Sequence, residues 1–164
     1  MDARHKAGHD GLGFDLSPSF QLRPYRTEDE GAAIALWGHT WQVAYPDIDF
    51  AARVAWWRER WRNDLVPKAE IVVAEQEGTL IGFVTIDPTG YLDQLVVAPD
   101  HWGSELATRL VDEAKRLSPG GITLLVNTDN ARAIRFYERN GFLRAGDDVN
   151  PTSGRTVLKM KWKG

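Results

Sequence analysis

Residues 95–107 have the composition of a strand that enters a helix through a short loop. Apolar residues precede Pro99, and Gly103 and Ser104 precede an amphipathic stretch. The first turn of a helix carries backbone N–H groups without an intrahelical partner and the positive end of the helix dipole. Such a turn can hold a phosphate group without a basic side chain. The spacing therefore indicates a candidate anion site, with an ordinary strand–helix connection as the alternative.

The overall composition favours such a local mechanism over a basic surface. The 164 residues contain 20 Lys and Arg against 23 Asp and Glu, a formal charge of -3, and no dense basic run. A nucleic-acid-binding protein normally shows a basic face or a basic total, so we expect no nucleic-acid partner. The chain has no cysteine, which excludes a disulfide framework, a cysteine-ligated metal and a cysteine nucleophile. We expect no metal site.

A second motif lies in residues 127–142, which read NTDNARAIRFYERNGF. The fixed spacings of Asn130, Ala133, the run 136–138 and the pair 141–142 resemble the C-terminal signature of the GNAT superfamily of acyl-CoA-dependent N-acyltransferases. Residues 95–107 stand where that family keeps its pyrophosphate loop. The resemblance covers about residues 20–162, with its most specific motifs in residues 91–142.

The resemblance implies acetyl-CoA as the co-substrate and assigns roles to individual residues. The strand at 91–97 would diverge from the strand at 122–126, and the pantetheine arm would enter the gap. The Val97 N–H would stabilise the oxyanion, and Tyr137 would protonate the departing thiolate as general acid. The other cofactor-binding residues that it implies are Leu95, Val96, Trp102, Gly103, Ser104, Glu105, Leu106, Ala107, Asn130 and Ala133.

Two of these residues also have ordinary structural interpretations. Asn130 is a plausible helix N-cap, a role compatible with binding the pantetheine arm. Tyr137 and Phe136 could be core aromatics. We interpret Glu138 and the pair 141–142 as structural.

The loop departs from the family pattern, which reads Arg or Gln, two residues, Gly, one residue, then Gly or Ala. Trp102 and Glu105 occupy the first two positions, and only Ala107 agrees. A Glu here adds bulk and negative charge beside an anion, at a cost on the order of 1 kcal/mol or more unless the side chain turns to solvent. We predict that Glu105→Gly tightens acetyl-CoA binding.

An amine acceptor must lose a proton before it attacks a thioester. Side chains alternate along a strand, so Asp93 is expected on the same face as Leu95 and Val97, where it could accept that proton directly or through water. The alternative for Asp93 is a polar residue without catalytic duty. Tyr91 shares the predicted face and is a candidate for the substrate pocket. His39 and Asp47 are further candidates for the base.

Five of the seven tryptophans lie between Trp37 and Trp61, on segments that the resemblance places over the acceptor. Trp57 and Trp61, four residues apart, are expected to pack against the sheet. Trp41 and Tyr45 are the candidates for substrate-pocket walls, because aromatic rings there could receive an apolar or cationic acceptor.

These residues need a scaffold, and the sequence predicts one in the order βααβββαβαββ. Strands are predicted at 20–23, 71–75, 80–86, 91–97, 122–126, 142–145 and 156–162. Helices are predicted from Thr27, with Glu30 completing a capping box, and over about 49–66, 103–117 and 130–140. Hairpins imply antiparallel pairs and helical connections imply a crossover. The fold class is α+β (mixed α/β), a central, mostly antiparallel sheet of six to seven strands flanked by helices.

The chain length suits one domain. We expect residues 1–18 to be a flexible leader and residues 19–164 to form the N-acetyltransferase domain. No apolar run approaches the roughly 18 residues of a membrane helix, and the start lacks the apolar stretch of a signal peptide. We therefore expect a cytoplasmic location and no membrane partner. An exposed last strand would permit a homodimer.

The expected function is transfer of an acetyl group from acetyl-CoA to a primary amine of a small molecule. The amine would attack directly, which suits the absence of cysteine. Two alternatives stay open. One is a non-catalytic acyl-CoA-binding or regulatory module with the same fold, which Trp102 and Glu105 favour. The other is transfer to an amine of a protein or peptide.

Overall fold

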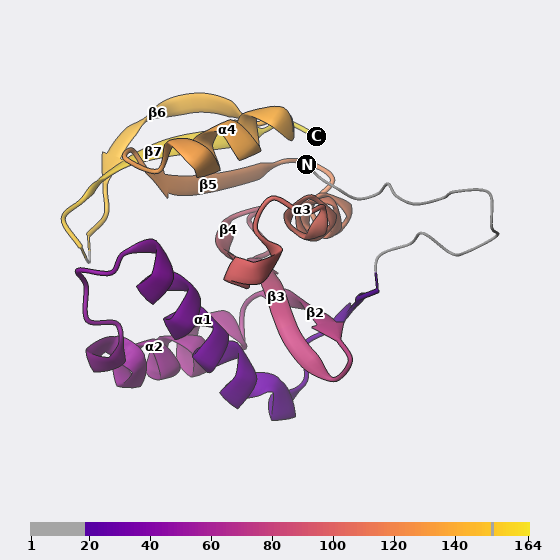
Figure 1. The fold of residues 1–164 in the computed structure, drawn as a ribbon. Helices are drawn as coiled ribbons and strands as arrows, with labels where there is room; N and C mark the ends of the chain where they lie inside the picture. The colour runs from indigo at the N-terminus through magenta and orange to yellow at the C-terminus, as the bar shows by residue number, and fades with distance from the viewer. Residues whose placement is uncertain (1–18, 152) are drawn as a thin grey trace.

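A computed structural model describes residues 19–151 and 153–164, so the predicted leader lies outside the described residues. The described helices are α1 (Glu30–Ala44), α2 (Val54–Arg60), α3 (Leu106–Leu117) and α4 (Ala131–Arg139). The described strands are β1 (Gln21–Pro24), β2 (Glu70–Gln76), β3 (Thr79–Ile86), β4 (Leu92–Val97), β5 (Ile122–Asn127), β6 (Leu143–Val149) and β7 (Thr156–Trp162). Their order confirms the predicted βααβββαβαββ succession (Figure 1).

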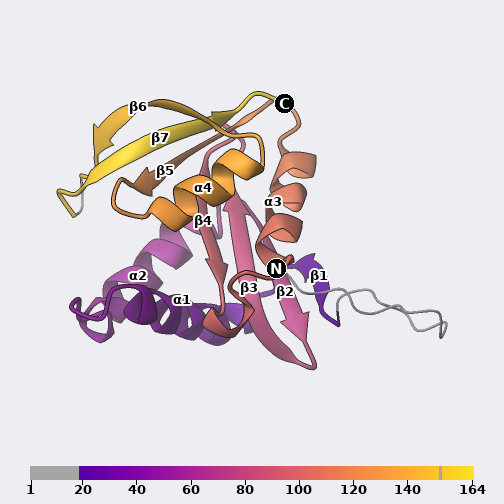
Figure 2. The ribbon, with the colours of Figure 1, turned by 45° about the horizontal axis from the view of Figure 1, so that its top comes forward.

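The strands form a four-stranded sheet in the order β1-β2-β3-β4 and a three-stranded sheet in the order β5-β7-β6. All named pairs are antiparallel. The two sheets touch where Tyr91 forms a parallel bridge with Thr123, and beyond it β4 and β5 diverge (Figure 2). The predicted α+β class is therefore confirmed, with the central sheet split between β4 and β5.

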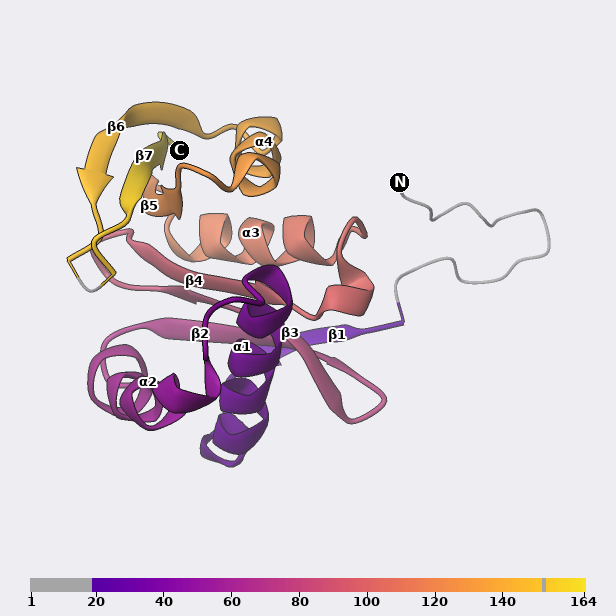
Figure 3. The same ribbon diagram turned by 60° about the vertical axis from the view of Figure 1, so that its left-hand side comes forward.

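Helices cover both faces of the four-stranded sheet because its inner strands carry apolar side chains on both faces. Val73, Phe83 and Val96 pack with α1 and α2, whereas Val84 and Val97 pack with α3. Figure 3 shows α1 and α3 on opposite sides of β4, and Figure 1 shows α4 lying along the three-stranded sheet. The face of α3 toward the sheet consists of Leu106, Leu110, Val111 and Ala114, which are all buried.

The tryptophans of α1 and α2 form most of the core on that side. Trp37 and Trp57 stack with ring centroids 4.6 Å apart. Trp61 meets Phe83 of β3 edge-on at 5.2 Å. Trp57 and Trp61 are buried, which confirms the prediction that this pair packs toward the sheet.

The start of α1 differs from the prediction. Asp29 replaces Glu30 in the cap: its Oδ2 accepts from the Arg26 N–H at 2.8 Å and from Arg23 Nη1 at 2.8 Å. Thr27 begins a 3-10 turn that ends at Asp29, and α1 follows from Glu30. The predicted capping box is therefore wrong by one residue. The carboxylate that accepts from the backbone N–H belongs to Asp29, and Arg23 holds it in place.

Two further predictions on the elements need correction. Helix α3 begins at Leu106 rather than Gly103, since Gly103 has a φ of 81° and cannot continue into a right-handed helix. The last strand is not at an edge: β7 lies between β5 and β6. The exposed edge of the three-stranded sheet is β6, whose residues are exposed throughout.

Candidate active site

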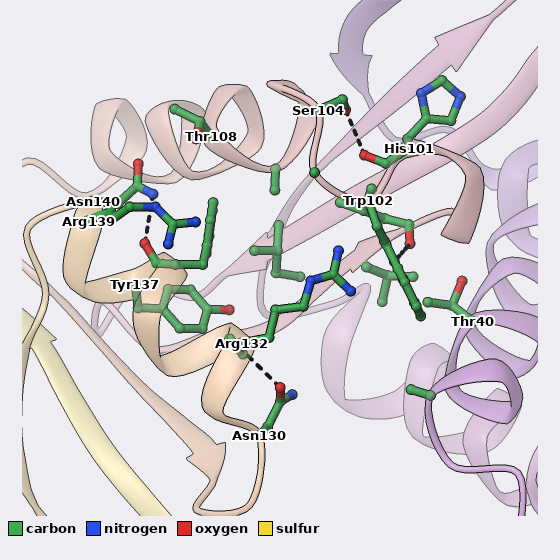
Figure 4. A pocket seen from close by; sticks show the side chains of 18 of the residues that line it. Thr40, His101, Trp102, Ser104, Thr108, Asn130, Arg132, Tyr137, Arg139 and Asn140 are labelled. Carbon is green, nitrogen blue, oxygen red and sulfur yellow. Dashed lines mark hydrogen bonds between the residues drawn. The ribbon is translucent and has the colours of Figure 1, made fainter. Parts of the chain in front are cut away.

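A cavity of about 470 Å³ lies between β4, the β4–α3 loop and α4, with the C-terminal half of α1 at one end (Figure 4). Eleven of the predicted site residues line it. Those from β4, the loop and the start of α3 are Leu95, Val96, Val97, Trp102, Gly103, Ser104 and Ala107. Those from α4 and α1 are Asn130, Ala133, Tyr137 and Trp41. Segments far apart in the sequence thus converge where the two sheets diverge.

The backbone of β4 offers hydrogen-bonding groups to this cavity. Val96 pairs with Phe83 in β3, and the Ala98 N–H donates to Ile81 O at 2.8 Å. Because antiparallel strands direct alternate residues to opposite sides, the N–H of Val97 points away from β3, toward the gap with β5. The Val97 carbonyl accepts a hydrogen bond from Trp102 Nε1 at 2.8 Å.

Hydrogen bonds of Ser104 fix the loop after β4 at the N-terminus of α3. Ser104 Oγ donates to His101 O at 2.7 Å and accepts from the Leu106 N–H at 3.3 Å. Glu105 is exposed and does not line the cavity, so its carboxylate lies outside the candidate anion site. The Leu106 side chain is fully buried in the core. Of the predicted loop residues, these two therefore do not line the cavity with their side chains.

The cavity has the donor chemistry that acetyl-CoA requires. The described residues that line it include two arginines, Arg132 and Arg139, and no Asp or Glu, although the whole chain is acidic. Helix α3 directs its positive end at the same space. The residues present therefore fit a polyanionic co-substrate, with backbone donors along β4 for an extended amide arm.

Tyr137 lies on the face of α4 toward the cavity. Its side chain packs edge-on against Phe142 with centroids 5.5 Å apart, and its hydroxyl points into the cavity (Figure 4). No other described residue forms a hydrogen bond with that hydroxyl. Burial raises the pKa of Tyr137 above its ordinary value of 10.0, because the phenolate would lose solvation. The phenol is therefore protonated at neutral pH and can donate.

Asn130 is the N-cap of α4, as the sequence predicted. Its Oδ1 accepts a hydrogen bond from the Ala133 N–H at 3.1 Å. The amide group thus fixes the first turn of the helix and leaves Nδ2 as a donor at the cavity wall.

Asp93 does not lie where alternation predicted. Its carboxylate accepts two hydrogen bonds from Arg60, one of them 3.1 Å long between Nη1 and Oδ1, and a third from Gln94 Nε2 at 2.9 Å. Arg60 belongs to the α2 side of the sheet, whereas Leu95 and Val97 pack on the α3 side. An irregularity opposite Thr85/Ile86 in β3 shifts the register of β4 and changes the face. The prediction of a shared face is wrong, and Asp93 does not line the cavity.

The other predicted pocket residues do not line the cavity. Tyr91 sits at the bridge to Thr123, where burial and the nearby Asp93 charge raise its pKa. Tyr45 stacks on Trp41 at 5.6 Å between centroids. Its hydroxyl accepts from Asn127 Nδ2 at 3.0 Å and donates to Asp129 Oδ1 at 3.5 Å. His39 and Asp47 are exposed and outside the lining.

Sequence reasoning missed several lining residues, of which Thr40 and Arg132 matter most. Thr40 is only 8% exposed, and its Oγ1 has no hydrogen-bond partner among the described residues. Its position next to Trp41 on α1 could have suggested it. Arg132 places its guanidinium carbon 4.6 Å from the centroid of the Trp102 ring. That contact joins residues 30 positions apart in the chain, so no local pattern predicts it.

None of the helices in the part of the chain that the structure describes combines the length and apolar character needed to cross a membrane. The same residues contain no group of three or more His, Cys, Asp or Glu placed to hold a metal ion.

Comparison with known proteins agrees with this geometry. A family model described as the acetyltransferase (GNAT) family matches residues 32–142. The peptidyl-lysine N-acetyltransferase YjaB of Salmonella typhimurium is 31% identical over 127 residues, which cover 76% of this chain and 84% of that protein. Mycothiol acetyltransferase of Sanguibacter keddieii is 32% identical over 154 residues, 82% of this chain, and the chain spans about half of that relative's length (47%).

A solved structure gives the same fold. The PaiA N-acetyltransferase of Thermoplasma acidophilum, crystallised with coenzyme A, superposes with a TM-score of 0.70 at 22% identity. The match covers 90% of this chain and 100% of that chain. The chain therefore belongs to the GNAT family of acetyltransferases, with acetyl-CoA as its co-substrate.

Proposed function

We propose that the chain transfers the acetyl group of acetyl-CoA to a primary amine of a small molecule by direct attack of the amine. One observation carries the proposal: a single cavity joins the Val97 end of β4, the Tyr137 hydroxyl and the Trp41 wall. An oxyanion donor, a proton donor and an acceptor surface are the three parts that such a transfer needs.

Each part has a defined role in the proposal. When bound, acetyl-CoA supplies the acetyl group as an activated thioester. The α3 N-terminus and Asn130 hold the phosphates and the pantetheine arm. The Val97 N–H donates a hydrogen bond to the thioester carbonyl oxygen and stabilises the negative charge that develops there. Tyr137, which burial keeps protonated, gives its proton to the departing sulfur.

The amine proton needs a different route from the one the sequence suggested. Asp93 does not line the cavity, and its carboxylate is paired with Arg60, so it is not placed to accept a proton from an amine at Val97. We therefore propose that the amine loses its first proton to solvent and attacks in its neutral form. The second proton leaves the nitrogen for solvent as the amide forms, and solvent restores the proton that Tyr137 gives to sulfur. The consequence is a rate that rises with pH as the free amine becomes more abundant.

The acceptor end favours a small molecule. Tyr45 of the α1–α2 segment is hydrogen-bonded to Asn127 and Asp129 after β5. Arg155, before β7, lies over the Tyr45 ring at 4.9 Å and pairs with Asp129 at 3.2 Å. These contacts link the segments beside Trp41. An extended peptide would need an open groove between those segments, whereas a small molecule would not. The relative named mycothiol acetyltransferase supports a small-molecule acceptor.

A second candidate acceptor is a lysine side chain of a protein, which the relative named peptidyl-lysine N-acetyltransferase supports. The test is a coenzyme A release assay in which small primary amines and lysine-containing peptides compete at equal concentration. We expect turnover with one or more small amines. Preferential turnover of the peptides would replace the small-molecule proposal with protein acetylation. Acetyl-CoA binding without turnover of any amine would support the non-catalytic module instead.

A further inference from the structure

We infer that Arg132 binds the diphosphate of acetyl-CoA and that Trp102 positions it for that role. The inference concerns binding of the co-substrate and does not depend on which amine accepts the acetyl group. Arg132 lies in the first turn of α4, and Trp102 lies in the β4–α3 loop on the opposite wall of the cavity. Figure 4 shows the two side chains meeting across the cavity.

The guanidinium of Arg132 has hydrogen-bonding capacity that the described residues do not use. It stacks on the Trp102 ring at 4.6 Å, and within the described residues it forms no hydrogen bond or ion pair. Arg155 makes a similar contact with the Tyr45 ring, but its guanidinium also binds Asp129. Stacking uses the face of a guanidinium and leaves the N–H donors in its plane available. Arg132 therefore offers unpaired donors beside the cavity.

Trp102 is itself fixed to the sheet. Its Nε1 donates to the Val97 carbonyl at 2.8 Å, which places the indole between β4 and the loop. The loop continues through Gly103 and Ser104 to the first N–H groups of α3. The indole thus holds the Arg132 charge beside the backbone donors of the helix N-terminus.

The charges around this point all favour a phosphate group. A helix N-terminus contributes only partial charges, whereas a guanidinium adds a full charge and can donate two parallel hydrogen bonds to phosphate oxygens. Among the described residues no carboxylate lines the cavity, and Glu105 is exposed outside the lining. A diphosphate is the part of acetyl-CoA whose two linked phosphates can contact the loop and Arg132 together.

The experiment is isothermal titration calorimetry on Arg132→Gln with three probes and no amine. Coenzyme A carries the diphosphate and a 3′-phosphate, dephospho-coenzyme A keeps only the diphosphate, and pantetheine has neither. We expect the variant to bind the first two about tenfold more weakly, as loss of a charge-assisted hydrogen bond predicts. Its affinity for pantetheine is expected to be unchanged.

The matched control is Arg135→Gln, an equal charge change on an exposed residue of the same helix that does not line the cavity. We expect it to bind all three probes as the wild type does. Equal losses for Arg132→Gln and Arg135→Gln would overturn the inference, since a general charge effect would then suffice. A loss confined to coenzyme A would also overturn it, because Arg132 would then bind the 3′-phosphate. Unchanged affinity in Arg132→Gln would exclude any phosphate contact.

The positioning role of Trp102 needs a double-mutant cycle. Trp102→Leu removes the stacking surface, and we expect it to weaken coenzyme A binding by about twofold to fivefold, the range of a partly exposed cation–π contact. In the Arg132→Gln background the same substitution is expected to cost less, because the positioned group is already gone. Effects that simply multiply would show that Trp102 does not act through Arg132. Circular dichroism spectra matching the wild type would show that each variant is folded.

Discussion

The Asp93 carboxylate is bound to the Arg60 guanidinium on the α2 side of β4, opposite the face that carries Leu95 and Val97. This ion pair is partly buried, with side-chain exposures of 27% for Arg60 and 16% for Asp93. It joins α2 to the strand whose backbone lines the cavity. The structure thus gives Asp93 a partner that positions β4, where the sequence suggested a catalytic base.

Asp93→Asn is therefore expected to reduce stability more than activity. The substitution leaves Arg60 without its charged partner, at a cost of about 1–2 kcal/mol in the free energy of unfolding. Glu138→Gln, which removes an exposed ion pair with Arg144, is expected to cost less than about 0.5 kcal/mol. Urea unfolding measures both. We expect kcat/KM of Asp93→Asn to stay within a few fold of the wild type, whereas a drop of about 100-fold would restore Asp93 as the base.

Burial of Tyr137 predicts a pH dependence of stability at the alkaline end. The folded-state pKa lies above the ordinary value of 10.0, so at high pH the folded state binds a proton that the unfolded state has released. The contribution of the protonated phenol to the free energy of unfolding is therefore complete below pH 10 and declines as the pH rises above it. In thermal unfolding, the Tm of the wild type is expected to fall above pH 10 more steeply than the Tm of Tyr137→Phe. Identical slopes would contradict the assignment of Tyr137 as a buried, protonated phenol.

Glu105→Gly is expected to tighten acetyl-CoA binding, but only about twofold to threefold. The carboxylate is exposed and outside the cavity lining, so solvent screens its repulsion of the phosphates. Glu105→Gln removes the charge but keeps a side chain of the same size. It therefore separates the effect of the charge from the effect of the backbone freedom that glycine adds. Calorimetry should show the same gain for both variants. Weaker binding by Glu105→Gln would contradict the account of the loop.

Thr40→Val is expected to preserve the fold and to raise the free energy of unfolding by about 1 kcal/mol. The Thr40 hydroxyl is buried at the wall of the cavity and has no partner among the described residues, and valine keeps its shape while removing the unpaired group. Thermal unfolding measures the change. Destabilisation of comparable size would show that the hydroxyl has a partner in solution.

Local patterns predicted most of the scaffold and a large part of the cavity wall. The bounds of β7 match the predicted residues 156–162, and β5 and α4 match within one residue at each end, because apolar alternation and helical spacing act over neighbouring residues. The positions of Asp93, Glu105 and Arg132 depended on contacts that local patterns do not contain. A register shift in β4 moved Asp93, and Arg132 meets Trp102 only once α4 docks beside the loop.

The most direct test of the central claim compares the wild type with Tyr137→Phe in one coenzyme A release assay, using the best small amine found. The account predicts that kcat falls about 100-fold, the usual contribution of a general acid. Acetyl-CoA affinity, measured by calorimetry on the same samples, is expected to stay unchanged. Equal kcat values for the two proteins would contradict the claim that this cavity carries out acetyl transfer with Tyr137 as its proton donor.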